Sequence, residues 1–275
     1  MEEHPSHTSE HGAGEEHHTS IWPFAIATTG GLAFAGIITN QYILVAGLVG
    51  FVAALGGWLW QDARGIRFGV FKEPTEPGIF RLVSSRKLGM WIFLVSEILF
   101  FSAIIGNALA LRTRASIWPN PATDTPLNIP LTAVNTFILI ASSLTMVQAL
   151  KGIERGSMLR LRVFLLATLA LGATFVSIQL IEYNALFFEE HLTPWQNLIR
   201  PELATFGTAF YMQTGFHGAH VSGGVIGLAY LTYKAFKRNW FSQANHEAVE
   251  LVGLYWHLVD VVWIFLFPLM YLIGR

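Results

Sequence analysis

A run of 24 residues, 88–111, contains a single ionisable side chain, Glu97, within LGMWIFLVSEILFFSAIIGNALAL. At about 1.5 Å per residue, a helix of this length spans about 36 Å, which is enough to cross the hydrocarbon core of a bilayer. Glu97 then lies about 14 Å from the start of the run, near the middle of the membrane, where a charge costs about 2.5–3.5 kcal/mol. We therefore expect Glu97 to be protonated, to be paired, or to face a polar cleft between helices.

The composition of the whole chain indicates an integral membrane protein. Hydrophobic residues make up 53% of the 275 residues and charged residues only 13%, whereas soluble domains carry about 25% charged residues. The net charge of −1, without a basic patch, gives no case for nucleic-acid binding. The chain has no cysteine, which excludes disulfides and Cys-ligated metals. It also has no phosphate-binding loop or dinucleotide-binding motif.

Apolar spans recur along the chain and predict an all-α membrane protein with seven transmembrane helices. Only a few residues separate the first two spans, so we expect these helices to form an antiparallel hairpin. The seven spans cover residues 21–40, 43–60, 88–111, 131–150, 163–184, 205–233 and 249–273.

The basic residues of the connections predict the orientation of the chain. Thirteen of the 17 Lys and Arg residues fall in the connections after the second, fourth and sixth spans. By the positive-inside rule, the N-terminus lies inside and the C-terminus outside. We divide the chain into a disordered His- and Glu-rich tail, the first hairpin, a basic cytoplasmic-side loop and the five remaining helices, at residues 1–20, 21–60, 61–87 and 88–275.

Polar side chains also occur inside the later spans. His217 and His220 lie three residues apart on the sixth span, His257 and Asp260 three apart on the seventh, and Glu182 lies near the outer end of the fifth. Residues at this spacing share one face of a helix, so the histidines could hydrogen-bond to neighbouring helices or ligate a metal or haem. Four amides are further candidates for hydrogen bonds between helices: Asn107, Asn135, Gln148 and Gln179.

Small residues recur every fourth position on the sixth span. This ridge lets a neighbouring helix approach closely, which is a packing feature rather than a chemical one. It consists of Gly215, Ala219, Gly223 and Gly227.

Several motifs, in this order along the chain, resemble subunit III of the haem-copper cytochrome c oxidases. They are FLVSEILFF, VNTFILIASS, SIQLIEY, TGFHGAHV and YWHLVDVVWIFLF. The resemblance implies the family's seven-helix form, in which the first hairpin is splayed from the five-helix bundle and the V-shaped cleft between them holds phospholipids. It also implies a multi-pass protein of the prokaryotic cell membrane or the mitochondrial inner membrane.

The resemblance implies a subunit of a proton-pumping oxidase that is itself non-catalytic. Such a subunit packs on subunit I, in a complex that includes subunit II, and sustains proton uptake and active-site stability. It carries no metal or cofactor of its own, because haem and copper belong to the partner subunits. Glu97 matches the family's buried carboxylate. The resemblance also favours a polar network that fixes the bundle, made of His217, His220, His257, Asp260 and Glu182.

The family's basic lipid-headgroup position falls on Lys234, and three further candidates for headgroup contacts are His246, Arg64 and Trp60. Lys234 stands where the family has Arg, which keeps the charge but loses the bidentate fork. Two inner-surface elements also depart from the family pattern, because Gly65 follows Arg64 and residues 76–81 read EPGIFR. Both departures concern residues proposed to collect protons on the inner surface.

Three alternatives stand beside this interpretation. The same subunit could belong to a quinol oxidase, because other subunits determine the electron donor. A proton-coupled transporter could use Glu97, Glu182 and Asp260 as a relay, although no inverted repeat is apparent. A membrane haem protein could use the histidines as ligands, and its isolated chain would then absorb visible light.

Overall fold

The computed structural model describes residues 21–63, 84–115, 118–193, 203–237 and 240–273. The predicted tail and most of the predicted basic loop lie outside these residues. The described part is all-α, as predicted, and two π-helical segments, η1 (Ala185–Glu189) and η3 (Pro268–Leu272), follow α5 and α7. Its seven α-helices are α1 (Trp22–Thr39), α2 (Gln41–Ala63), α3 (Ser85–Arg114), α4 (Ile129–Glu154), α5 (Met158–Asn184), α6 (Ala204–Lys237) and α7 (Glu247–Phe267).

Several helices extend beyond the predicted apolar spans because polar side chains cap them. The Ser84 hydroxyl accepts a hydrogen bond from the backbone N–H of Lys87, and Asn128 caps α4 in the same way. Among the described helices, α2, α3, α4, α5 and α7 are long and apolar enough to cross a membrane. That α1 and α6 also cross it stays a prediction.

The chain divides into two compact units, Met1–Gly78 and Ile79–Arg275. The first contains the predicted hairpin, in which α1 and α2 are joined through Asn40. A Cβ atom at Gly36 or Gly47 would overlap the backbone of the opposite helix, so glycine permits this close approach. At the open end of the hairpin, the Trp22 indole donates to Gln61. The predicted antiparallel hairpin is therefore confirmed.

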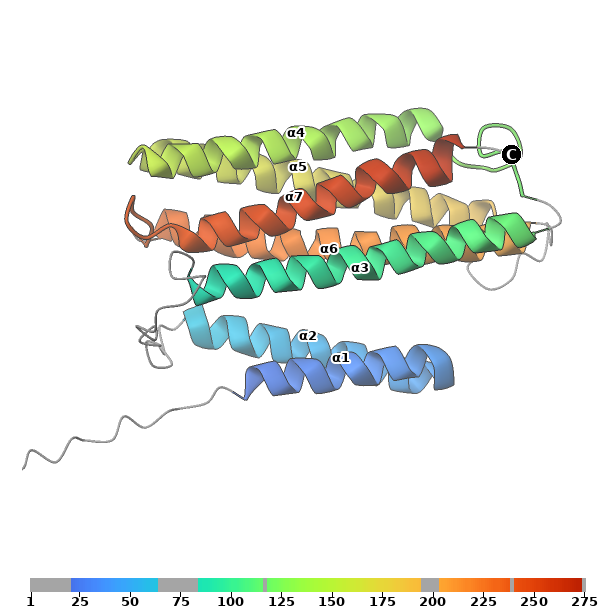
Figure 1. Ribbon diagram of the computed structural model, residues 1–275, viewed down its shortest axis with the longest axis horizontal. Coiled ribbons are helices and arrows are strands. Elements are labelled where there is room, and N and C mark those ends of the chain that lie inside the picture. Colours follow the sequence, from blue (N-terminus) through green and yellow to red (C-terminus); the bar gives the residue numbers. More distant parts are fainter. Residues whose placement is uncertain (1–20, 64–83, 116–117, 194–202, 238–239, 274–275) are drawn as a thin grey trace, which may run out of the picture. The chain divides into compact units, whose positions relative to one another are not determined.

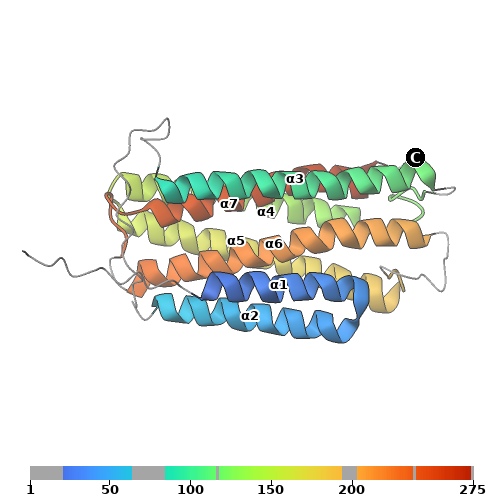
Figure 2. The ribbon, with the colours of Figure 1, turned by 60° about the horizontal axis from the view of Figure 1, so that its bottom comes forward.

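The second unit is a bundle of α3–α7, whose helices run side by side along its length (Figures 1 and 2). Trp256 of α7 is fully buried at its centre, and its indole donates to the Ser142 hydroxyl of α4 at 2.9 Å. A Cβ atom at Gly172 of α5 would lie 2.6 Å from the Trp256 ring, and one at Gly224 of α6 would lie 2.8 Å from it. These two glycines make room for the indole and so position four helices around it.

The predicted small-residue ridge does not make this close approach. Cβ atoms at Gly215, Gly223 and Gly227 would meet their nearest neighbours at 3.8–3.9 Å, an ordinary van der Waals distance, and Ala219 is exposed. The tight contact lies one residue further along, at Gly224, because the face of α6 toward Trp256 is rotated from the predicted ridge.

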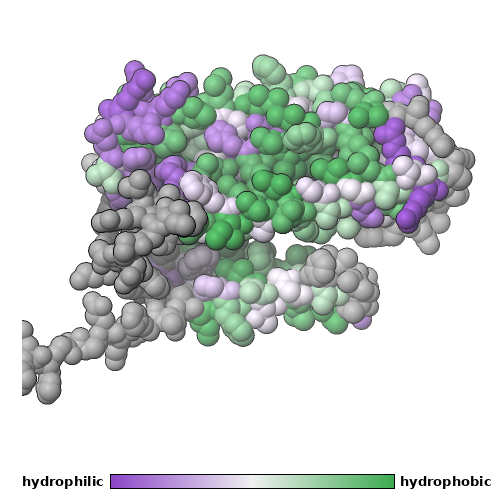
Figure 3. All heavy atoms as spheres, viewed as in Figure 1, coloured by the Kyte–Doolittle hydropathy of each residue, from purple (hydrophilic) through white to green (hydrophobic). Residues whose placement is uncertain are grey.

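The outer surface of the bundle is apolar over the middle of the helices, and hydrophilic residues gather toward the two ends (Figure 3). The apolar side chains of α3 contribute strongly to this surface. Ile92, Val95 and Leu99 are each more than half exposed within the chain. A helix that exposes so much apolar area must contact lipid or another membrane subunit.

Candidate functional site

Glu97 of α3 has a direct partner on α6. Its Oε2 atom lies 2.8 Å from Nε2 of His220, and the side chains are only 17% and 21% exposed. Glu97 is the 13th of the 30 residues of α3, and its neighbours Val95 and Leu99 point outward. The helical period turns Glu97 toward the bundle and away from the outer face that Val95 and Leu99 form.

The other ring nitrogen of His220 determines how many protons the contact holds. Nδ1 lies 2.7 Å from the backbone oxygen of Phe216, one turn earlier on α6. A carbonyl oxygen can only accept, so Nδ1 must carry a hydrogen. The contact between Nε2 and Oε2 therefore holds one proton, which makes either a neutral pair or an ion pair. The net charge is zero in both forms, which offsets the cost of placing a carboxyl group in the membrane.

Aromatic rings enclose the pair and connect it to α7. The Phe101 ring makes an edge contact with the His220 ring, with a centroid separation of 4.9 Å. The Tyr255 hydroxyl of α7 donates to the backbone oxygen of His220 at 2.9 Å, and its ring stacks on Phe93 of α3. The pair thus sits at the meeting point of three helices, in a poorly hydrated environment where a hydrogen bond is electrostatically stronger than in water.

Glu182 forms a separate buried site. It is 5% exposed and accepts hydrogen bonds from the Thr132 hydroxyl of α4 at 3.0 Å and from the Tyr271 hydroxyl of η3 at 3.2 Å. Its neighbour Tyr183 hydrogen-bonds to Thr214 of α6 at 2.6 Å. No feature of the sequence points to these partners, because Thr132 and Tyr271 lie 50 and 89 residues from Glu182.

The remaining members of the predicted polar network lie at other points of the bundle. His217 is fully buried and stacks on the Trp263 ring at 4.8 Å. Asp260 is buried on α7, one helical turn from His257. Their role in fixing the bundle stays a prediction, whereas the amide of Asn135 does join two helices by donating to the Phe175 oxygen at 3.1 Å.

The candidate headgroup residues differ in their surroundings. The Lys234 ammonium group at the end of α6 lies 4.4 Å from the Tyr230 ring centre and 4.3 Å from that of Trp240. His246 bonds to the backbone oxygen of Gln243 at the start of α7. Trp60 is 61% exposed near the end of α2, and Arg64 lies outside the described residues.

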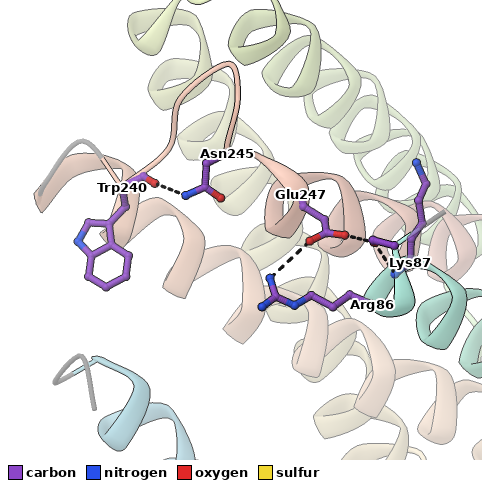
Figure 4. A network of polar contacts seen from close by, with 6 residues as sticks. Arg86, Lys87, Trp240, Asn245 and Glu247 are labelled. Carbon is purple, nitrogen blue, oxygen red and sulfur yellow. Dashed lines mark hydrogen bonds and ion pairs between the residues drawn. The ribbon is translucent and has the colours of Figure 1, made fainter. Parts of the chain in front are cut away.

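Ion pairs that the sequence did not predict join the first turns of α3 and α7. Arg86 lies 3.4 Å from Glu247, and Lys87 pairs with Glu250. Ser84 also donates to Glu247. Figure 4 shows Arg86 and Lys87 beside Glu247, together with the hydrogen bond from Asn245 to the backbone of Trp240.

Metal binding was an open alternative for the histidines. In the described ranges, no group of three or more His, Cys, Asp or Glu residues is placed so that it could hold a metal ion. The ring nitrogens of His220 are engaged by Glu97 and Phe216, which leaves this histidine without a free ligand atom.

Comparisons with known proteins show which protein family the chain resembles. The family model described as cytochrome c oxidase subunit III matches residues 13–275. A probable cytochrome c oxidase subunit 3 of Rickettsia prowazekii is 31% identical over 279 residues, covering 93% of each chain. A probable subunit 3 of Mycobacterium tuberculosis is 35% identical and covers 68% of this chain and 87% of its own. A heme-copper oxidase subunit I+III of Aeropyrum pernix is 27% identical over 98% of this chain but only 32% of its own.

Proposed function

The chain belongs to the cytochrome c oxidase subunit III family, and on this premise we propose that it is a non-catalytic subunit that sustains proton uptake in a haem-copper terminal oxidase. It is an integral membrane protein that associates with subunit I of the oxidase. The fused Aeropyrum pernix protein supports that association, since its name joins subunits I and III in one polypeptide. The apolar outer face of α3 offers area for such a contact or for lipid.

The Glu97–His220 pair is the observation that carries the proposed role in proton uptake. The 2.8 Å contact holds one proton that can reside on either side chain without changing the net charge. Our proposal is that the pair exchanges this proton with its surroundings during turnover. It catalyses no redox step itself, and its proposed effect is to keep protons available to subunit I during turnover, which protects the oxygen-reducing site from inactivation.

Bound phospholipid is the second part of the proposal. Lys234 presents its charge between two aromatic rings at the end of α6, where tryptophan and tyrosine rings commonly lie at the membrane interface. His246 lies at the start of the following helix. We propose that Lys234 and His246 bind the phosphate of a phospholipid headgroup. Arg64 and Trp60 contact lipid headgroups in the same way.

Purification through a tag on this chain, in a mild detergent, tests whether the chain is a subunit of a haem-copper oxidase. We expect a larger haem- and copper-bearing subunit to co-purify, together with the visible spectrum of an oxidase and subunit II on a gel. A stable, colourless chain without partners would instead favour the proton-coupled transporter. A haem band that remains in the isolated polypeptide would overturn the non-catalytic role.

Oxidation assays on the same complex decide between the two donors. The Rickettsia and Mycobacterium relatives are named as cytochrome c oxidase subunits, so we propose that reduced cytochrome c supports oxygen consumption. Oxygen consumption with a quinol and none with cytochrome c would establish the quinol oxidase alternative.

A further inference from the structure

Among the buried polar side chains without a hydrogen-bond partner in the described part of the chain, three lie on α5 and α6. They are Gln179 of α5 and Gln213 and His217 of α6, which are 5%, 0% and 0% exposed. No well-aligned hydrogen bond in the described part of the chain engages either amide or either ring nitrogen of His217, although Tyr271 lies beside the Gln179 side chain. Six polar atoms in this state are unusual, because the large majority of buried polar side-chain atoms are paired with protein or ordered water.

Contacts on either side place these groups at one level of the bundle. The Phe175 ring of α5 lies 6.1 Å from the His217 ring, and the Tyr183 ring lies 6.3 Å from the Phe210 ring of α6. Gln179 lies midway between Phe175 and Tyr183 along α5, and Gln213 lies between Phe210 and His217 along α6. The two amides therefore occupy the interval between the bracketing contacts, with His217 one turn from Gln213.

The chemistry of these groups selects water as their ligand. Each amide offers a donor and an acceptor, and a neutral imidazole offers one of each, so the set matches a molecule that both donates and accepts. An unsatisfied buried group costs about 1–3 kcal/mol, and buried waters that make about three hydrogen bonds commonly remove this cost.

A groove on the surface of the bundle gives water a way in. It lies between α3 and α6 and has a volume of about 360 Å³, and its otherwise apolar lining contains three polar residues, Asn107, Thr208 and Gln213. Gln213 thus forms both part of the groove wall and part of the buried polar set.

We propose that Gln179, Gln213 and His217 bind a cluster of buried water molecules that enters through the groove between α3 and α6. His217 and His220 lie three residues apart on α6, so this water sits within one helical turn of the Glu97–His220 pair. These waters carry exchangeable protons in the interior of the bundle, close to the Glu97–His220 pair but not through the contact between Glu97 and His220. The inference stands independently of the proposed oxidase role.

Hydroxyl-radical labelling by X-ray pulses, read by mass spectrometry, tests the proposal on the purified complex. Radicals form where water is bound, so a side chain without exposure is oxidised only if water touches it. Trp263 stacks on His217, whereas Trp256 packs against Gly172 and Gly224. Both indoles are 0% exposed and both donate to a hydroxyl of α4, so Trp256 is a matched dry control.

We expect His217 and Trp263 to be oxidised several-fold faster than Trp256. Equal, slow labelling of all three would overturn the proposal. The double variant Gln179→Leu/Gln213→Leu should reduce Trp263 labelling to the Trp256 level, while Gln148→Leu, the same change on an exposed residue of α4, should leave it unchanged. If the double variant does not assemble, the wild-type comparison still decides.

Discussion

The Nε2 atom of His220 lies 2.8 Å from Oε2 of Glu97, 123 residues earlier in the chain. The carboxyl group that would be costly in an isolated membrane helix therefore has a partner on α6, and the Phe216 backbone fixes the orientation of that partner. The contact predicts what happens when either side chain is changed.

Glu97→Gln should leave assembly and the first turnovers intact. The amide fits the same space and can donate to Nε2 of His220, but it cannot give up a proton. We expect a normal initial rate of oxygen consumption, followed by earlier inactivation, measured with an oxygen electrode over successive turnovers. Ser96→Ala, on the exposed neighbouring position, is the control. Loss of the first turnovers would contradict an accessory role.

His220→Ala should destabilise the chain more than Glu97→Gln does. It leaves the partly buried Glu97 carboxyl group without its partner. Removing one partner of a fully buried pair costs about 3–5 kcal/mol. The side chains are 17–21% exposed, so we expect a smaller but measurable loss in thermal stability of the complex. Adding Glu97→Gln to His220→Ala should restore part of it, because the unpaired carboxyl group is then gone. Strict additivity of the two changes would argue against the pair.

Gly224→Ala should impair assembly, and Gly223→Ala should not. A Cβ atom at Gly224 would lie 2.8 Å from the Trp256 ring, while one at Gly223 meets the Tyr255 hydroxyl at 3.8 Å. Overpacking of this kind costs about 1–3 kcal/mol. The yield of folded complex for the two variants measures the difference. Equal yields would contradict the packing around Trp256.

Glu182→Gln should be tolerated better than Glu182→Ala. The glutamine keeps one acceptor oxygen, and its NH2 group can donate to the other hydroxyl. Alanine removes both contacts, which leaves Thr132 with only its bond to the Asn128 oxygen and Tyr271 without the acceptor of its hydroxyl proton. Unsatisfied buried groups cost about 1–3 kcal/mol each. Thermal unfolding of the two purified variants should therefore differ clearly, and similar values would mean that these hydroxyls have other partners.

Arg86→Ala should have almost no effect on stability at any salt concentration. The Arg86 side chain is 77% exposed, and exposed ion pairs are worth about 0–1 kcal/mol. Thermal unfolding in low and high salt checks this. A large, salt-sensitive loss would show that the charge network between α3 and α7 is stronger than its exposure indicates.

The sequence determined the helical class, the hairpin and the positions of the later helices, because apolar length and period are local properties of the chain. It also pointed to Glu97 and His220 separately as polar groups inside apolar spans. The proposed function of these residues came from the resemblance to a known family and not from the periodicity of the sequence.

Which of these groups meet depends on how the helices pack. The pairing of Glu97 with His220, the partners of Glu182 and the contact of Gly224 with Trp256 all link residues that are distant in sequence or depend on the rotation of one helix about its axis. A rotation of about 100° separates adjacent residues of a helix, so the predicted ridge and the observed contact differ by one residue yet face different neighbours. Packing sets this rotation, and it is a property of the whole bundle rather than of any one helix.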